Sequence, residues 1–410
     1  MSDTVAIPHG LPLDRTDGPF RPPAELGRLR DTRPLSRMTY FPDGHEGWLV
    51  TGHAHAREVL ADTRFSSVVA GTATRSPIDI PGLDEHEPQP SRPGFFIRMD
   101  PPDHTRLRRM LTGVFTVKRM KQLEPRVDRI VTDHLDAMAA GPRPVDLVEA
   151  FALPVPSLVI CELLGVPYAD RDRFQRDSAR LLSLDRTTEE RNTALASIGA
   201  LLSRLVKDKR SAPTDDLLSE LAARDDLTDA ELEGIATLLL IAGHETTANM
   251  LGLGTFALLQ HRDQWEALRT DPSLVDGAVE ELLRWLSIVH IGPTRIASED
   301  IDFHGHRIAA GELVTVSVPA ANHDAAKFED PATLDVRRKA NGHVAFGHGV
   351  HQCLGQQLAR IEMRIGYRRL VERFGDLRLA IPADRVRMRT DMAIYGVHEL
   401  PVTWDQEETA

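Results

Sequence analysis

One of the two cysteines in this 410-residue chain lies at the end of a loop rich in glycine and histidine. The loop is Phe346-Gly347-His348-Gly349-Val350-His351-Gln352-Cys353-Leu354-Gly355. Apolar residues at helical spacing follow and predict a buried helix face, at Leu354, Leu358, Ile361 and Ile365. A sulfur at a helix N-terminus faces unpaired amide groups and the positive end of the helix dipole, so we expect a thiolate here. Cys353 is therefore a candidate metal ligand.

Three interpretations of this loop are open. Its glycines let the backbone turn tightly and lie against a flat ligand, which suits a thiolate ligand to haem iron. A zinc site is the second interpretation, with ligands among Cys353, His343, His348 and His351. In the third, the cysteine simply packs as a small hydrophobic side chain. The loop alone does not decide among them.

A second group of reactive residue types lies within a long apolar stretch, as Ala242-Gly243-His244-Glu245-Thr246-Thr247. Glycine inside a helix costs about 1 kcal/mol relative to alanine, so Gly243 needs a reason. Small residues such as Ala242 would let a flat ligand approach, while Glu245 and Thr246 could relay protons. The alternative is a tight helix–helix contact at Gly243, with the Thr246 hydroxyl bonded back to a backbone carbonyl.

Basic residues form a third group. His104 and Arg108, at positions i and i+4, lie on one predicted helix face, where the guanidinium could bind a carboxylate. Arg295 and His351 are two further isolated basic residues. Together the four donors suit the two propionates of haem. The alternative is that each is a separate surface charge.

An acidic–basic pair at i and i+3, Glu281 and Arg284, precedes a run of apolar residues. Exposed pairs of this kind contribute only a few tenths of a kcal/mol. The apolar neighbours indicate burial here, and Arg338 is a candidate third member. We expect a structural role for these three residues.

These residues lie on a framework that is predicted to be mostly helical. Period-two patterns indicate a hairpin at 39–50 and small sheets within 295–319. Helical patterns run from His104 to about residue 290. The stretch 68–102 is rich in Pro, Gly, Ser and Asp, and irregular loops of this length are usually functional or disordered.

The longest predicted helix begins at a capping box, Thr228-Asp229-Ala230-Glu231, and continues without proline to about Gln260. A helix of that length crosses an entire domain. No linker or repeat divides the chain, so we predict one domain over residues 1–410, with a flexible N-terminal segment over about 1–20.

Composition is that of a globular protein, with 41% hydrophobic and 27% charged residues. The net charge of −12 argues against nucleic acid as a general partner. No apolar run reaches the roughly 18 residues of a membrane span, and no signal peptide is evident. Cys161 and Cys353 lie far apart, which favours a reducing compartment. We therefore expect a cytoplasmic protein.

In their order along the chain these motifs resemble those of the cytochrome P450 superfamily. The matching residues are Ala242-Gly243-His244-Glu245-Thr246, Glu281-x-x-Arg284, Arg338 and Phe346-x-x-Gly349-x-x-x-Cys353-x-Gly355. Met99-Asp100-Pro101-Pro102-Asp103-His104 and Phe115-Thr116 resemble the soluble bacterial branch. The resemblance covers nearly the whole chain. It implies a mainly α fold with small β-sheets, with haem b between the long helix and the cysteine loop.

The resemblance also implies a role for each residue. Cys353 would be the proximal thiolate ligand, which favours O–O cleavage. Thr246 and Glu245 would deliver protons on the opposite side. The propionates would bind His104, Arg108, Arg295 and His351, and further haem contacts would come from Phe346, Gly347 and Ala242. The buried ion-pair network would comprise Glu281, Arg284 and Arg338.

The implied reaction is monooxygenation, in which one oxygen atom of O2 enters a hydrophobic small molecule by hydroxylation or epoxidation. A macrolide, terpenoid, steroid-like compound or other secondary metabolite would fit. Electrons would come from a ferredoxin that a separate reductase serves, docked at a face formed by Arg106, Arg109, Arg360 and Arg364. We expect a monomer. Substrate contacts are expected from 68–98, 170–200, 239–247, 288–292 and 392–396.

Overall fold

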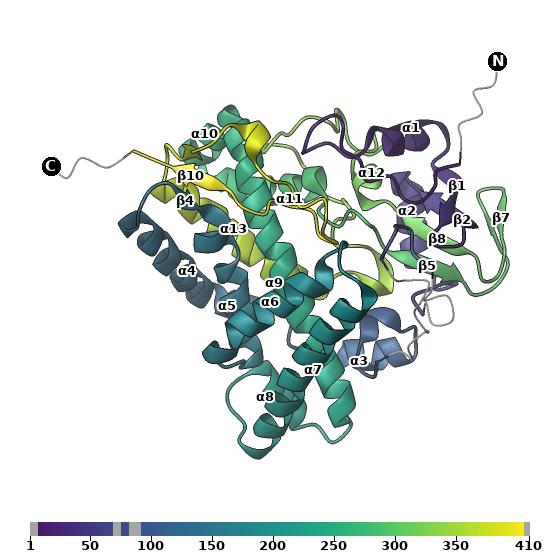
Figure 1. The fold of residues 1–410 in the computed structure, drawn as a ribbon, viewed down its shortest axis with the longest axis horizontal. Helices are drawn as coiled ribbons and strands as arrows, with labels where there is room; N and C mark the ends of the chain where they lie inside the picture. The colour runs from purple at the N-terminus through teal and green to yellow at the C-terminus, as the bar shows by residue number, and fades with distance from the viewer. Residues whose placement is uncertain (1–6, 69–74, 82–91, 406–410) are drawn as a thin grey trace.

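The computed structural model describes residues 7–68, 75–81 and 92–405. Helices form the body of the molecule, with a five-stranded sheet at one side and a three-stranded sheet at the other (Figure 1). The α-helices are α1 (Ala24–Thr32), α2 (His53–Ala61), α3 (Asp103–Thr112), α4 (Val117–Ala140), α5 (Pro154–Leu164), α6 (Arg171–Leu182), α7 (Thr188–Ser211), α8 (Leu217–Ala222), α9 (Asp229–Gln260), α10 (Arg262–Thr270), α11 (Val275–Leu286), α12 (Val318–Asn322) and α13 (Gln356–Arg373). The strands are β1 (Leu35–Tyr40), β2 (His45–Val50), β3 (Phe65–Ser66), β4 (Val145–Asp146), β5 (Thr294–Ala297), β6 (Ile301–Phe303), β7 (His306–Ile308), β8 (Leu313–Val316), β9 (Arg378–Leu379) and β10 (Pro401–Thr403). The predicted fold class, mainly helical with small sheets, is confirmed.

The long helix α9 passes through the middle of the helical body (Figure 1). Its predicted capping box is present: the Thr228 N–H donates to the Glu231 carboxylate at 3.0 Å, and the Glu231 N–H donates to the Thr228 hydroxyl at 3.2 Å. The helix ends at Gln260, so its 32 residues span about 48 Å. Its buried residues lie on every side, because α5, α7 and α13 pack around it. The helix therefore reaches the centre of the molecule.

The sheets agree with the predicted period-two patterns. Strands β1 and β2 form an antiparallel hairpin, and the turn between them contains Gly44 at φ +69°. Strand β8 adds to β2 in parallel, and the sheet continues in the order β1-β2-β8-β5-β3. Strand β5 contains Arg295, one of the predicted site residues. This sheet thus supports one side of the site.

Residues 7–20 of the segment expected to be flexible pack against the rest of the molecule. His9 Nδ1 lies 2.7 Å from Thr39 Oγ1, and Leu11 is buried. The Phe20 ring stacks on Trp285 of α11 with ring centroids 5.4 Å apart. Within the described residues, no helix combines the length and the apolar character needed to cross a membrane.

A largely buried ion-pair network joins α11 to the chain that leads into the cysteine loop. Glu281 accepts from Arg284 at 2.7 and 2.8 Å and from Arg338 at 3.0 Å. Arg284 also donates to the carbonyl of Asn322 at 2.9 Å, and the side-chain oxygen of Asn322 accepts from Val344 N–H at 2.8 Å. The network therefore extends to Val344, which lies two residues before the start of the cysteine loop at Phe346. It positions that loop.

Candidate active site

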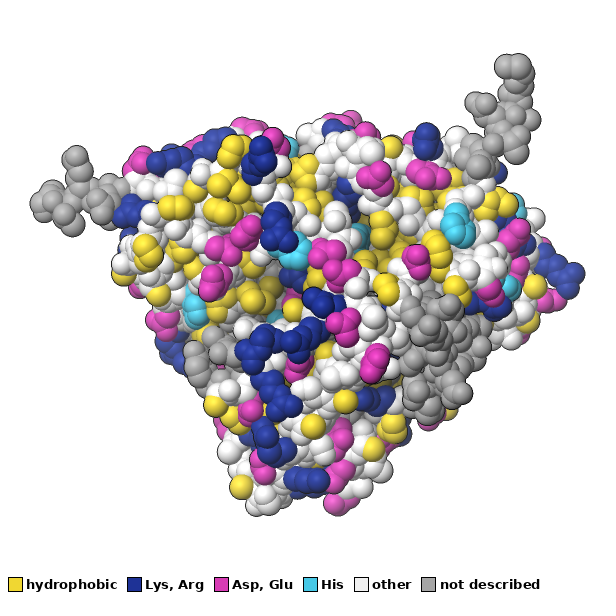
Figure 2. Space-filling model, in the orientation of Figure 1, with side chains coloured by type: hydrophobic (Ala, Val, Ile, Leu, Met, Phe, Trp, Pro, Cys, Tyr) yellow, Lys and Arg dark blue, Asp and Glu magenta, His cyan; other side chains and the backbone are white. Residues whose placement is uncertain are grey.

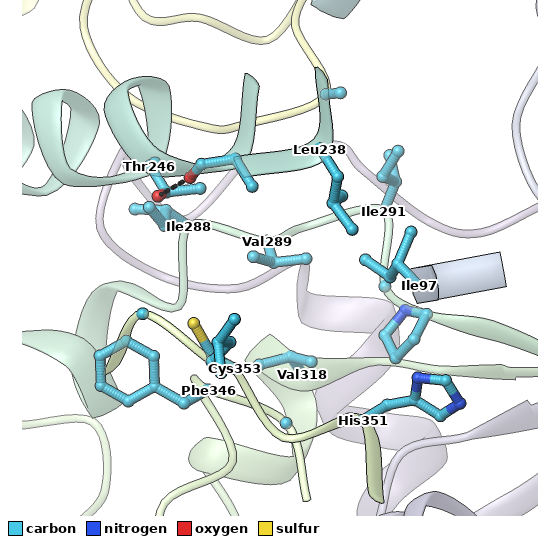
Figure 3. A pocket seen from close by; sticks show the side chains of 18 of the residues that line it. Ile97, Leu238, Thr246, Ile288, Val289, Ile291, Val318, Phe346, His351 and Cys353 are labelled. Atoms are coloured by element: carbon cyan, nitrogen blue, oxygen red, sulfur yellow. Dashed lines mark hydrogen bonds between the residues drawn. The ribbon is translucent and has the colours of Figure 1, made fainter. Parts of the chain in front are cut away.

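A cavity of about 910 Å³ separates α9 from the cysteine loop. Figure 3 shows the Cys353 sulfur pointing toward α9, with Thr246 on the facing wall. Apolar side chains, among them Leu238, Val289 and Val318, line much of the remaining surface. The structure thus brings the two motifs of the sequence, about a hundred residues apart, to opposite walls of one cavity.

The cysteine loop is held by its own backbone. The Cys353 N–H donates to the Phe346 carbonyl at 2.8 Å, which closes the loop just before α13. Gly347 and Gly349 have φ of +69° and +73°, a region that side chains other than glycine's rarely adopt. A Cβ at Gly349 would also collide with the Leu60 carbonyl oxygen at the end of α2. Only glycine lets the loop lie this close to α2.

Burial of the Cys353 thiol raises its pKa above the usual value, because the cavity wall excludes water from the sulfur. The backbone amides of Gly355 and Gln356 and the guanidinium of Arg108 act in the opposite direction. The helix N-terminus therefore favours the thiolate as expected, but burial of the sulfur outweighs it. A bound metal cation would deprotonate the thiol, since coordination requires the thiolate.

The zinc interpretation of the loop is wrong. His343 Nε2 lies 3.1 Å from Glu280 Oε2, so its imidazole is engaged by α11. Across the described ranges, no three side chains of the His, Cys, Asp and Glu types come together in a way that could hold a metal ion. Cys353 does not have the protein ligands that a zinc site needs.

Both interpretations of the α9 motif are partly visible in the structure. Gly243 packs tightly against α5, because a Cβ there would lie 2.9 Å from Ile160. The Thr246 hydroxyl donates to the Ala242 carbonyl at 2.9 Å (Figure 3). Both Ala242 and Thr246 also line the cavity. One turn of α9 therefore makes a tight helix contact on one side and presents a hydroxyl to the cavity on the other.

Glu245 lies outside the cavity lining, on a different side of α9 from Thr246. It is buried, and its Oε2 is 3.1 Å from Arg389 Nη2 and 3.2 Å from Asn249 Nδ2. Arg389 is buried as well. The structure therefore gives this carboxylate a fixed cationic partner that the sequence did not indicate.

The four basic residues predicted to bind propionates converge at one edge of the cavity. Arg108, Arg295 and His351 line it, and the His104 ring lies 4.2 Å from that of His351 between centroids. Arg108 also donates to the Gln352 carbonyl at 2.5 Å, which ties α3 to the cysteine loop. Burial lowers the pKa of Arg295 to about 10. Burial, together with the nearby charges of His104 and Arg295, lowers the pKa of His351 to about 3.

Arg98 is a fifth member of this edge that sequence reasoning missed. It lines the cavity, and burial lowers its pKa, with no carboxylate close enough to oppose that effect. Its charge acts on Arg295, which places the two side chains near each other. The signal in the sequence was a single basic residue at the end of the irregular stretch, and nothing local distinguished it from a surface charge.

The residues at this edge fit a ligand with two anionic groups. Both ring nitrogens of His104 and Nε2 of His351 are buried and have no hydrogen-bond partner among the described residues. Buried polar atoms in proteins are normally paired, so these nitrogens and the adjacent arginines call for acceptors from a ligand. The Cys353 sulfur faces the same cavity. A flat cofactor that has two carboxylates and an iron able to take a thiolate, namely haem, fits this arrangement.

Fold and site together indicate a haem protein. A protein-family model described as cytochrome P450 matches residues 163–390. The chain belongs to the cytochrome P450 family. It is a P450 monooxygenase, and as such uses haem iron, a redox partner and a hydrophobic substrate.

Curated and structurally solved relatives extend this likeness over nearly the whole chain. Cytochrome P450 105C1 from a Streptomyces species is 53% identical over 386 residues, which cover 94% of this chain and 96% of that protein. Pentalenic acid synthase of Streptomyces avermitilis is 48% identical over 98% of both chains. The crystal structure of CYP105P1 in complex with filipin I superposes with a TM-score of 0.92 at 43% identity, covering 98% of this chain and 100% of that one.

Proposed function

We propose that this P450 uses haem b to hydroxylate or epoxidise a hydrophobic secondary metabolite, with electrons from a ferredoxin-type donor. The observation that carries the proposal is the cavity that sets the Cys353 sulfur opposite the Thr246 hydroxyl. Haem iron with a thiolate ligand supplies the activation of O2 when it is bound. The protein's own side chains hold the cofactor, deliver protons and orient the substrate.

Each side chain at the cavity edge has a proposed part in holding the cofactor. Cys353 would bind the iron, and the rings and guanidiniums at the cavity edge would bind the two propionates; they belong to Arg98, His104, Arg108, Arg295 and His351. The unpaired imidazole nitrogens support this assignment, because propionate oxygens would complete their hydrogen bonds. Phe346, Gly347 and Ala242 line the cavity and form the remaining contacts with the cofactor.

Thr246 is the proposed proton donor at the cavity wall. In the structure its hydroxyl proton points to the Ala242 carbonyl, and a rotation about the Cβ–Oγ1 bond of Thr246 would turn that proton toward the cavity. Glu245 is the proposed acid that supplies Thr246 in turn. Because Arg389 and Asn249 hold its carboxylate away from the cavity, Glu245 must release them before it can reach the site.

The cavity lining supports a hydrophobic substrate. Each described segment expected to contact substrate contributes residues to the cavity, for example Leu181, Leu239, Ile288 and Ala393. Residues 69–74 and 82–91 of the predicted loop lie outside the described part. The likeness to pentalenic acid synthase and to a protein solved with filipin I supports a secondary metabolite as the substrate here.

Three of the four arginines expected to dock the electron donor are already paired within the chain. Ion pairs join Arg106 to Glu231, Arg360 to Glu280 and Arg364 to Glu124. Arg109 is exposed and has no ion-pair partner among the described residues. Arg360 also lies over the Phe346 ring, with its guanidinium carbon 4.5 Å from the ring centroid. Of the four, Arg109 is therefore the one most available to a partner.

A hollow beside α13 supports docking on the cysteine side of the molecule. Val117, Lys121 and Arg360 line this hollow of about 340 Å³. Val117 is 52% exposed, and Val350 of the cysteine loop is 40% exposed. Asp276 and Glu280 also line the hollow and pair with Arg364 and Arg360, so its exposed apolar side chains and Lys121 are the groups that would meet an acidic protein surface. We propose that a ferredoxin with an acidic face docks here.

Reconstitution tests the proposed function. Secondary metabolites are first screened for binding by the spin shift of the iron, and those that bind are incubated with a ferredoxin, an NADPH-dependent reductase and isotopically labelled O2. The expected result is a product that contains one labelled oxygen atom and that forms only when ferredoxin is present. Product without label, or equal turnover without ferredoxin, would contradict the proposal.

A further inference from the structure

The cavity extends well beyond the space between Cys353 and Thr246. The Pro93 and Gly94 backbone packs on α9 at Gly234 and Glu231. Gly234 lies 12 residues before Thr246, a distance of about 18 Å along the helix axis. Leu238 and Leu239 lie between these points and line the cavity. The backbone of Pro93 and Gly94 therefore covers α9 at Gly234, and the part of the helix that lines the cavity runs from Leu238 past Thr246.

Three arginines line the cavity apart from those at the proposed propionate edge. Arg75 pairs with Asp43, with Nε 2.9 Å from Oδ2. Arg92 and Arg191 also line it, and within the described ranges neither has an ion-pair partner. The Arg92 guanidinium lies near Gly199 of α7, and Arg191 is eight residues earlier on that helix, about 12 Å along its axis. Two uncompensated cations thus face a mostly apolar cavity from one side.

These two cations are distinct from the proposed propionate edge. Arg295 at that edge is influenced by the charge of Arg98, and His351 by those of Arg108 and Arg295. Burial lowers the pKa of Arg191, with no contribution from a charged neighbour among the described residues. Propionate binding therefore leaves Arg191 and Arg92 uncompensated, and half-buried cations without partners are costly to retain.

The surface around these helices is also basic. Figure 2 shows a band of Lys and Arg side chains over α6 and α7. Of the exposed arginines in this region, Arg173, Arg180 and Arg186 each pair with a carboxylate, and Arg176 has no ion-pair partner among the described residues. The whole chain has a net charge of −12, which would repel an anion at long range. Because most of the band is compensated, the two arginines of the cavity carry the inference.

We propose that the cavity binds a hydrophobic substrate that carries a carboxylate, with the carboxylate held at the α7 side of the cavity by the charges of Arg191 and Arg92 while the apolar part lies between Thr246 and Cys353. The inference rests on the proposed function, and it adds the chemical class of the substrate. A neutral substrate would fill the cavity but leave both guanidiniums without acceptors, which penalises its binding. An acid therefore binds more tightly than its own ester.

Matched pairs of an acid and its methyl ester test this selectivity in the haem-loaded protein. The probes are dodecanoic acid with methyl dodecanoate and abietic acid with methyl abietate, at pH 7.5 where the acids are ionised. Dissociation constants come from the spin shift of the iron and from calorimetry. We expect at least one acid to bind on the order of tenfold more tightly than its ester, as charge-assisted hydrogen bonds to arginine imply.

Arginine variants locate the effect. Arg191→Gln and Arg92→Gln should each weaken acid binding on the order of tenfold and leave ester binding within about twofold. The control is Arg204→Gln, because Arg204 is an exposed residue of α7 that pairs with Asp170 and does not line the cavity. It should leave both constants unchanged.

The inference would be overturned if neither acid bound more tightly than its ester, or if both acids failed to bind at millimolar concentration. It would also be overturned if Arg191→Gln and Arg92→Gln left the acid's advantage intact. A third contradicting result would be an equal loss of that advantage in Arg204→Gln. The red-shifted CO-difference band of each variant reports on haem and thiolate ligation separately. Loss of that band in the wild-type protein would instead contradict the proposed function.

Discussion

At the scale of single residues, two side chains on opposite walls of the cavity carry the chemistry. Thr246 presents the hydroxyl, and Cys353 presents the sulfur. Two alternatives were open for Thr246: a hydroxyl bonded back to its own helix, or a hydroxyl at the site. The structure combines them, because the hydroxyl donates to the Ala242 carbonyl and Thr246 lines the cavity. The hydrogen bond to the helix keeps the hydroxyl ordered in this structure.

Replacing Thr246 with alanine should leave haem binding intact and uncouple NAD(P)H consumption from product formation. The ratio of product to NAD(P)H should fall on the order of tenfold, because positioned proton donors commonly contribute at least that much. Thr246→Ser retains the hydroxyl and should stay close to wild type. The test measures NAD(P)H consumption and product formation in parallel. Full coupling of the two in the alanine variant would remove Thr246 from the mechanism.

At the scale of elements, the site depends on how α11 and α12 hold the cysteine loop. The carboxylate of Glu281 is fully buried between Arg284 and Arg338. Arg284 also donates to the Asn322 carbonyl, and the Asn322 side chain accepts a hydrogen bond from the Val344 N–H. Buried ion pairs stabilise a fold little in net terms, but the loss of one partner leaves an uncompensated charge. The network therefore acts as a positional constraint on the loop.

Glu281→Ala should destabilise the haem-loaded protein by about 3 to 5 kcal/mol, because it leaves two arginines without their carboxylate. The chain offers a matched control in Glu266, which pairs with Arg269 at 2.6 Å and i, i+3 spacing on the surface. Glu266→Ala should cost less than about 1 kcal/mol. Denaturant unfolding of both variants compares the pairs, and equal small losses would show that the buried network does not hold the fold.

At the scale of the whole molecule, the sequence predicted what is local and missed what depends on distant packing. The capping box and length of α9 follow from consecutive residues, and so do the β1–β2 hairpin and the helix after Cys353. The partner of Glu245 could not be predicted, since Arg389 comes from a remote irregular segment.

The same limit explains the direction of the Cys353 pKa. Local sequence predicted the helix amides that stabilise a thiolate, and those amides do act on the sulfur. Desolvation of the buried sulfur is a tertiary effect, and it outweighs them. Arg98 was missed for a related reason, because only the folded cavity distinguishes it from a surface charge.

Buried histidines should make the stability of the whole fold sensitive to acid. Burial lowers the pKa of His290 to about 4 and that of His323 to about 3, against about 6.5 in the unfolded chain. Below pH 6.5 the unfolded state binds more protons, so stability is fully present above that pH and falls as the pH drops toward 4. His290 alone accounts for roughly 3 kcal/mol of this loss.

Unfolding free energies measured between pH 4 and 8 check this dependence. The wild-type protein should be level above about pH 7 and lose stability below pH 6.5, and His290→Gln should lose less over the same interval because it has no group to protonate. The comparison uses each protein's own value at pH 8 as the reference. Identical slopes for the two proteins would contradict the assignment to His290.

The central claim is that Cys353 holds the haem iron as a thiolate. The CO-difference spectrum of the reduced protein tests it most directly, with Cys353→Ala compared with Cys161→Ala, in which the chain's other cysteine, buried in α5, is replaced. We predict that Cys161→Ala keeps the red-shifted band and that Cys353→Ala loses it. A Cys353→Ala protein that keeps the band would contradict the account.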